Sequence, residues 1–190
     1  MNKKNKKFVG YFPKINIDIN DLKIPNTNKK WITEKTIIEI ASVSNCMRKG
    51  PDIPQGSNEL GFYDNEILAL SSIQNETNRY TMFAYTLFLF CYEDGNLIEK
   101  SKMINKAKKL KAVFVPERYK LIGYDVTSNS LSDFFECSPL SCNQGFKEFK
   151  TNKYCLFNEI DYAVECQKII SSSNFEPGKQ YLFEVYKKTD

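Results

Sequence analysis

The contents of cysteine and histidine limit the chemistry available to this chain. Its 190 residues include six cysteines and no histidine. Histidine is the usual proton carrier near neutral pH and the commonest metal ligand. Its absence excludes a Ser-His-Asp triad, a Cys-His pair and a His-ligated zinc site built from this chain alone. Thiolates, carboxylates, lysines, tyrosines and the backbone remain as reactive or binding groups.

Potential reactive groups are densest around Cys137 and Cys142, which flank a Ser-Pro-Leu-Ser turn. Either thiol is a candidate nucleophile if Lys147, a helix N-terminus or backbone amides lower its pKa, and Glu136 is the neighbouring candidate carboxylate. The two thiols are also close enough in sequence to form a redox-sensitive disulfide. The spacing differs from the Cys-x-x-Cys of oxidoreductases, so the nucleophile and redox interpretations both stay open.

A zinc site is the third interpretation of the same segment. The gap between Cys137 and Cys142 is within the range of zinc ligands, and Cys155 and Cys166 would complete the site. The second pair is separated by ten residues and does not form a compact knuckle. Buried cysteine is the competing interpretation, because Cys91, Cys155 and Cys166 all have apolar neighbours at strand or helix spacing.

Carboxylates near this segment form a further candidate site. A pair of carboxyl groups about 5 to 9 Å apart can perform acid and base steps in hydrolysis. Sequence spacing does not reveal such a distance, and surface carboxylates are the ordinary alternative. The candidates are Asp125, Asp133, Glu136 and Glu148.

A lysine-rich segment at residues 100–111 predicts a basic amphipathic helix. Its apolar side would carry Met103, Ala107 and Leu110, and its basic side Lys106, Lys108 and Lys109. Such a helix can bind nucleic acid or another anionic partner. A solvated surface helix is the simpler interpretation. The basic residues are nearly all lysine, with arginine only at positions 48, 79 and 118, and the formal net charge is +4.

Aromatic residues in predicted loops suggest a protein-binding patch. One group is Phe62 and Tyr63, which follow a Gly- and Pro-rich loop. The other is Phe134 and Phe135 beside the cysteine segment, where Asn143 can adopt a left-handed turn conformation. Residues of these types fill the core beneath loops more often than they bind partners.

The chain is expected to form one domain over residues 8–190 after a flexible basic tail at residues 1–7. No internal repeat is evident. The longest apolar run, residues 81–92, is shorter than the roughly 20 residues that cross a membrane, so no membrane insertion is expected. The basic start is not followed by an apolar signal segment, which predicts a cytoplasmic protein.

Apolar periodicity predicts an α+β domain with a mixed, mostly antiparallel sheet, about three helices and a C-terminal βαβ unit. Helices are expected near residues 64–71, 100–111 and after Asn158, and residues 33–44 favour either a helix or a strand. An Asp-Gly hairpin turn is expected at residues 93–96. The βαβ unit would pair strands 154–157 and 181–186 in parallel. The expected strands cover residues 15–19, 81–92, 97–98, 112–115, 121–126, 154–157 and 181–186.

Two classes of function follow from these features. The first is a non-enzymatic interaction protein, such as an inhibitor, immunity or defence factor, whose partner is another protein. The second is a thiol-dependent enzyme or a redox or zinc protein centred on Cys137 and Cys142. Binding of nucleic acid through residues 100–111 is a weaker alternative. No cofactor is predicted apart from the conditional zinc.

Overall fold

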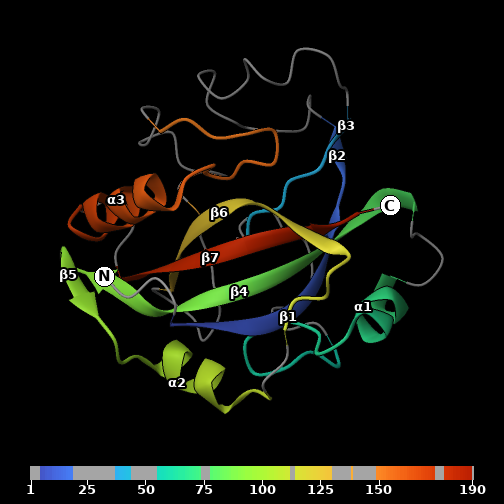
Figure 1. The fold of residues 1–190 in the computed structure, drawn as a ribbon, viewed down its shortest axis with the longest axis horizontal. Helices are drawn as coiled ribbons and strands as arrows, with labels where there is room; N and C mark the ends of the chain where they lie inside the picture. Colours follow the sequence, from blue (N-terminus) through green and yellow to red (C-terminus); the bar gives the residue numbers. More distant parts are fainter. Residues whose placement is uncertain are drawn as a thin grey trace.

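The computed structural model describes most of the chain, namely residues 5–18, 37–43, 55–73, 78–111, 114–129, 138, 149–173 and 178–189. Among these residues a five-stranded sheet, a two-stranded ribbon and three helices form the fold (Figure 1). The α+β class with a mostly antiparallel sheet is therefore confirmed. In chain order the elements are β1 (Lys6–Ile15), β2 (Ile17–Asp18), β3 (Ile37–Ile38), α1 (Glu66–Ile73), β4 (Tyr80–Glu93), β5 (Asn96–Ile98), α2 (Lys102–Lys109), β6 (Tyr119–Asn129), α3 (Ile160–Ser171) and β7 (Lys179–Lys188).

The strands of the main sheet are ordered β1-β4-β7-β6, and β5 pairs with β4 through the predicted hairpin turn. β4 is central and buried on both faces, as its continuous apolar run predicts. Phe83, Tyr85 and Leu87 share one core cluster with the buried side of α2. Ala84 and Phe88 point to the other face, where they belong to the clusters of α1 and α3 respectively. One face therefore carries α2, and the other carries α1 and α3. α1 and α3 lie at opposite ends of the sheet (Figure 1).

The C-terminal strand–helix–strand order is present as β6, α3 and β7, but the predicted parallel pairing is wrong. β6 and β7 pair antiparallel, and residues 154–157 form a turn rather than a strand. The reason is the segment before α3. Its residue Phe157 forms an antiparallel bridge with Tyr124 of β6. The chain runs back along β6 before α3 begins, so α3 follows the direction of β6 and β7 opposes it.

Other boundaries also differ from the sequence expectation. Lys6 and Lys7 belong to β1 instead of the predicted tail. Ile37 and Ile38 form a strand, which is one of the two predicted alternatives. Helices α1 and α3 begin directly after their N-cap residues, Asn65 and Glu159. Each helix thus begins one residue later than expected from the sequence. The predicted strand at 112–115 is not among the described strands, and residues 112–113 lie outside the described part.

The two halves of the sheet repeat one structural unit, which corrects the expectation that the chain has no repeat. The first unit is β1, a turn at residues 58–64, α1 and β4. The second is β6, a turn at residues 152–158, α3 and β7. β4 and β7 are the central pair, and β1 and β6 are the two edges. The sheet is therefore arranged symmetrically about its middle.

Strand pairing shows how closely the units correspond. In the first unit Gly10 pairs with Tyr85 directly after an irregularity in β1. In the second unit Gly123 pairs with Val185 directly after the same irregularity in β6. Tyr85 and Val185 also pair with each other across the centre of the sheet. A pseudo-twofold axis normal to the sheet thus passes through the Tyr85–Val185 pair.

The two turns are organised by asparagines at equivalent positions. The side-chain amide nitrogens of Asn58 and Asn152 donate to the edge-strand carbonyls of Val9 (2.9 Å) and Ile122 (2.8 Å). Each asparagine oxygen accepts two backbone N–H groups of its own turn. These donors are Leu60 (3.0 Å) and Phe62 (3.3 Å) for Asn58, and Tyr154 (2.9 Å) and Leu156 (3.3 Å) for Asn152.

A glycine in each edge strand allows the turn to approach. Gly10 has a φ of 134° and Gly123 a φ of 151°. A Cβ atom would lie 2.4 Å from the carbonyl oxygen of Tyr63 at the first position and 2.6 Å from that of Phe157 at the second. The turns cover the middle of both sheet edges, which limits pairing with other chains there.

Candidate functional site

Helix α1 carries an apolar outer surface, which we call the α1 surface and define as Ile67, Leu68 and Leu70. The Asn65 side chain begins the helix by accepting the backbone N–H of Leu68 at 3.0 Å. The buried side of the helix consists of Glu66 and Ala69. The exposed fractions of Ile67, Leu68 and Leu70 are 77%, 44% and 39%. These three apolar side chains therefore point to solvent.

The repeat supplies an internal comparison for this surface. α3 occupies the equivalent position, and Ala163 is buried there as Ala69 is in α1. The outer side of α3 is mainly charged, with exposed Asp161, Glu165 and Lys168 beside a 44%-exposed Ile169. The same architecture therefore tolerates a charged residue at the position of Ile67, where α3 has Asp161. The positions of Leu68 and Leu70 correspond to Tyr162 and Val164, which are partly buried against the core in α3.

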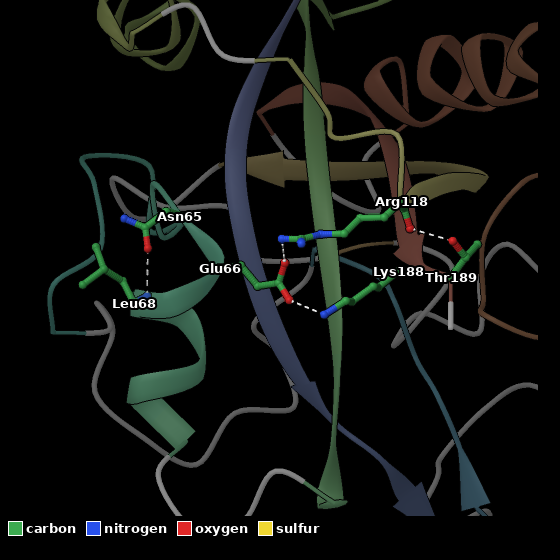
Figure 2. A network of polar contacts seen from close by, with 6 residues as sticks. All are labelled: Asn65, Glu66, Leu68, Arg118, Lys188 and Thr189. Carbon is green, nitrogen blue, oxygen red and sulfur yellow. Dashed lines mark hydrogen bonds and ion pairs between the residues drawn. The ribbon is translucent and has the colours of Figure 1, made fainter.

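Glu66 fixes α1 to the sheet through two ion pairs (Figure 2). Its carboxylate oxygens lie 2.6 Å from Nη2 of Arg118 and 2.7 Å from Nζ of Lys188. The Glu66 side chain is 9% exposed, whereas those of Arg118 and Lys188 are 55% and 45% exposed. Burial raises the pKa of Glu66, but the two cations outweigh burial and leave that pKa below its ordinary value.

Two tyrosines line the same part of the sheet. The rings of Tyr11 and Tyr119 are 5.5 Å apart. Burial, followed by the negative charge of Glu66, raises the pKa of both hydroxyls. The Tyr119 hydroxyl is buried without a hydrogen bond of normal geometry among the described residues. Both groups are neutral at physiological pH, so they can donate hydrogen bonds but do not act as bases.

A second carboxylate lies near the centre of this face. Nζ of Lys6 is 2.7 Å from each carboxylate oxygen of Glu184, and the Tyr186 hydroxyl donates to Glu184 at 2.5 Å. Burial and the Glu184 charge raise the pKa of Tyr186 and Tyr124. This cluster therefore consists of a satisfied ion pair and neutral hydroxyls, which is a structural or binding arrangement rather than a catalytic one.

Asp125, one of the carboxylates considered for acid–base chemistry, is completely buried. It accepts hydrogen bonds from Ser42 Oγ (2.9 Å), Val43 N (2.6 Å) and Ser138 Oγ (2.8 Å). Burial raises its pKa to about 6 even though these hydrogen bonds favour the charged form. Without exposed surface it has no access to a substrate. Its effect is to fasten residues 42–43 and 138 to β6.

The described thiols are buried and poorly suited to nucleophilic chemistry. Burial raises the pKa of Cys91 to about 11 and that of Cys155 to about 12, and it raises the pKa of Cys166 as well. A thiolate is the reactive and metal-binding form. Within the described part of the chain no group of three or more cysteines and carboxylates could hold a metal ion. Cys137, Cys142 and Glu136 lie outside the described residues, as do Asp133 and Glu148.

The lysine-rich helix forms as expected, and its apolar side faces the core. Met103, Ile104 and Ala107 are buried in the cluster that also contains Leu87. Ser101 caps the helix by accepting the N–H of Ile104 at 3.1 Å. Lys108 and Lys109 are exposed, and Lys106 donates to the carbonyl oxygen of Glu59 at 3.2 Å. The lysines thus line the solvent side of α2.

The aromatic patch predicted at Phe62 and Tyr63 is wrong, because each is only 3% exposed. Phe62 packs in the core with Tyr85 at a ring distance of 5.2 Å. The turn organised by Asn58 directs both rings inward. Phe134, Phe135 and Asn143 lie outside the described residues.

Sequence reasoning missed the α1 surface, although a signal for it exists. The turn sequences Asn-Glu-Leu-Gly-Phe-Tyr-Asp at 58–64 and Asn-Lys-Tyr-Cys-Leu-Phe-Asn at 152–158 align, and the alignment places Ile67 opposite Asp161 and Ser71 opposite Glu165. An apolar residue opposite a charged one on the outer side of equivalent helices marks a surface that differs between the units.

Among the described residues, no helix is both long enough and apolar enough to cross a membrane. Comparison with known proteins found no matching family model, no matching curated protein and no matching solved structure. The candidate site therefore depends on the geometry of this chain alone.

Proposed function

We propose that this protein is a non-enzymatic binding module that recognises another protein through the α1 surface. The observation that carries the proposal is the exposure of Ile67, Leu68 and Leu70 on one helix. Ile67 is the most exposed of the three, and the equivalent position of α3 carries the charged Asp161. Exposed apolar side chains gathered on one helix face are typical of protein docking sites. Phe114, which is 89% exposed, adds an apolar ring next in sequence to Val115, a residue of the same cluster as Ala69.

The titratable groups support a binding role over a catalytic one. A general acid or base works best with a pKa near the operating pH and with access to the substrate. Asp125 has such a pKa but no exposed surface. The described thiols and the tyrosines of the α1 face have raised pKa values and remain protonated at neutral pH.

The test is a double variant, Ile67→Asp with Ser71→Glu, which copies the α3 residues at the equivalent positions. Both sites are exposed, so the free energy of unfolding in urea is expected to change little. Proteins captured from a lysate by the wild-type chain and identified by mass spectrometry are expected to disappear with this variant. The matched control is Glu165→Ala with Lys168→Ala on α3, which is expected to keep them.

If wild type, the α1 double variant and the α3 control capture the same proteins, the α1 surface is not the binding site. The same conclusion follows if none of the three captures a specific protein. Electrostatic binding of nucleic acid through α2 is a second candidate, motivated by the exposed Lys102, Lys108 and Lys109. It requires an affinity for a nucleic acid duplex that falls steeply as salt is raised.

A further inference from the structure

Arg118 and Lys188, at the flank of α1, use only a small part of their hydrogen-bonding capacity. Each side chain makes one described contact, to opposite oxygens of the Glu66 carboxylate (Figure 2). A guanidinium has five N–H donors and an ammonium has three. Because the side chains are 55% and 45% exposed, their remaining donors are accessible from solvent.

The charge of this group is not balanced. Two cations share one carboxylate, and that carboxylate is almost buried. Within this group of three side chains one positive charge is left without a carboxylate, and the exposed parts of Arg118 and Lys188 carry it. Glu66 holds the two cations in place from below and leaves their outer side open to an oxyanion.

The cations lie close to one part of the α1 surface. Leu70 follows Glu66 by one helical turn, so the two residues lie on neighbouring parts of the same side of α1. Leu68 lies on the side of α1 away from Glu66 (Figure 2). A single docked segment can therefore contact apolar residues and the cation pair at once.

We propose that the protein partner of the α1 surface is an amphipathic segment with apolar anchors and an acidic side chain that binds Arg118 and Lys188. The inference rests on the proposed function and specifies the chemistry of the partner. A guanidinium recognises a carboxylate through two parallel hydrogen bonds, and a neighbouring ammonium adds a further contact. Such a pair at the rim of an apolar contact determines which partners bind.

The experiment uses two synthetic amphipathic helical peptides with the same leucine positions, one with glutamate and one with lysine on its polar side. Binding is followed by the amide resonances of the isotopically labelled full chain during titration. The glutamate peptide is expected to shift the resonances of Ile67, Leu68 and Leu70. Its affinity is expected to exceed that of the lysine peptide by at least about fivefold, and to fall as salt is raised.

The triple variant Arg118→Gln, Lys188→Gln and Glu66→Gln removes the charges without leaving an unpaired carboxylate. It is expected to bind the two peptides equally, whereas the control Lys120→Gln retains the preference for glutamate. Equal binding of both peptides to the wild-type chain would overturn the acidic partner while leaving the proposed function intact. If neither peptide shifts the α1 resonances, the proposed function fails as well.

Discussion

Replacement of Asp125 by asparagine is expected to remove one pH dependence from the stability of the protein. Asp125 has no exposed surface and accepts three hydrogen bonds. An asparagine of the same shape can accept from the Val43 N–H and the Ser42 hydroxyl through its oxygen and donate to Ser138 Oγ through its nitrogen. The contacts are kept, and the buried charge is lost.

The magnitude follows from the pKa of Asp125, which burial raises from the ordinary 3.8 to about 6. A difference of that size between the unfolded and folded states corresponds to roughly 3 kcal/mol. The folded state binds the proton more tightly, so this carboxyl adds stability below the ordinary pKa. The added stability is lost as pH rises through about 6. Above that value the ionised carboxylate is a cost that Asp125→Asn avoids.

The assay is urea unfolding of wild type and Asp125→Asn at constant ionic strength, between about pH 3 and pH 7.5. The variant is expected to be the more stable at the upper end, by up to roughly 3 kcal/mol, and to match wild type near the lower end. Asp94→Asn is the control, because Asp94 is exposed in the hairpin turn before Gly95. The free energy of unfolding of this control is expected to change with pH in the same way as that of wild type.

Parallel curves for wild type and Asp125→Asn over the whole range would refute the reasoning, because they would mean that this carboxyl titrates alike in the folded and unfolded chains. A variant that is less stable than wild type at every pH would show that the charged form is needed by Ser42, Val43 and Ser138. Either result would refute the expectation that the buried charge of Asp125 lowers the stability of the protein at neutral pH.

Three further predictions concern stability and reactivity. Asn58→Ala and Asn152→Ala are expected to lower the free energy of unfolding by similar amounts, roughly 2 to 4 kcal/mol each, because each side chain loses the same set of hydrogen bonds; clearly unequal losses in urea unfolding would contradict the equivalence of the units. Glu66→Gln is expected to destabilise the protein at neutral pH by about 1 to 2 kcal/mol, after allowance for the half-exposed cations, and the difference should shrink in acid because the pKa of Glu66 is lowered in the fold. Thermal unfolding of wild type and Glu66→Gln from neutral to acid pH measures the difference in stability. A difference that stays constant with pH would argue against the ion pairs. Cys91 is expected to resist iodoacetamide at about pH 8 until the chain unfolds, since its pKa is about 11; peptide mass mapping that finds it alkylated in the native protein would show that the thiol is accessible.

Much of the fold follows from local sequence signals. The continuous apolar run at 81–92 predicted the central strand, and Asp94-Gly95 predicted the hairpin to β5. The spacing of Met103 and Ala107 predicted α2 and its buried side. These predictions hold because periodicity and turn chemistry act within a few residues of the chain.

The direction of β7 did not follow from such signals. A strand–helix–strand order resembles a parallel crossover, but the turn at Asn152 returns the chain along β6 before α3 begins. That reversal depends on a hydrogen bond from Asn152 to the carbonyl oxygen of Ile122, 30 positions earlier in the chain. Local propensity contains no information about a contact at that separation.

The candidate site shows the same division. The sequence by itself determined which chemistry is absent, because a chain without histidine cannot supply a histidine-based catalytic group. It also contained the repeat, in Lys-Phe-Val-Gly-Tyr at 7–11 and Lys-Leu-Ile-Gly-Tyr at 120–124, a similarity visible only once the geometry shows what to compare. Only the tertiary structure decided that Ile67 faces solvent while Phe62 is buried. Both residues are apolar, but the Asn58 turn directs Phe62 into the core, whereas Ile67 lies on the side of α1 that faces away from the sheet.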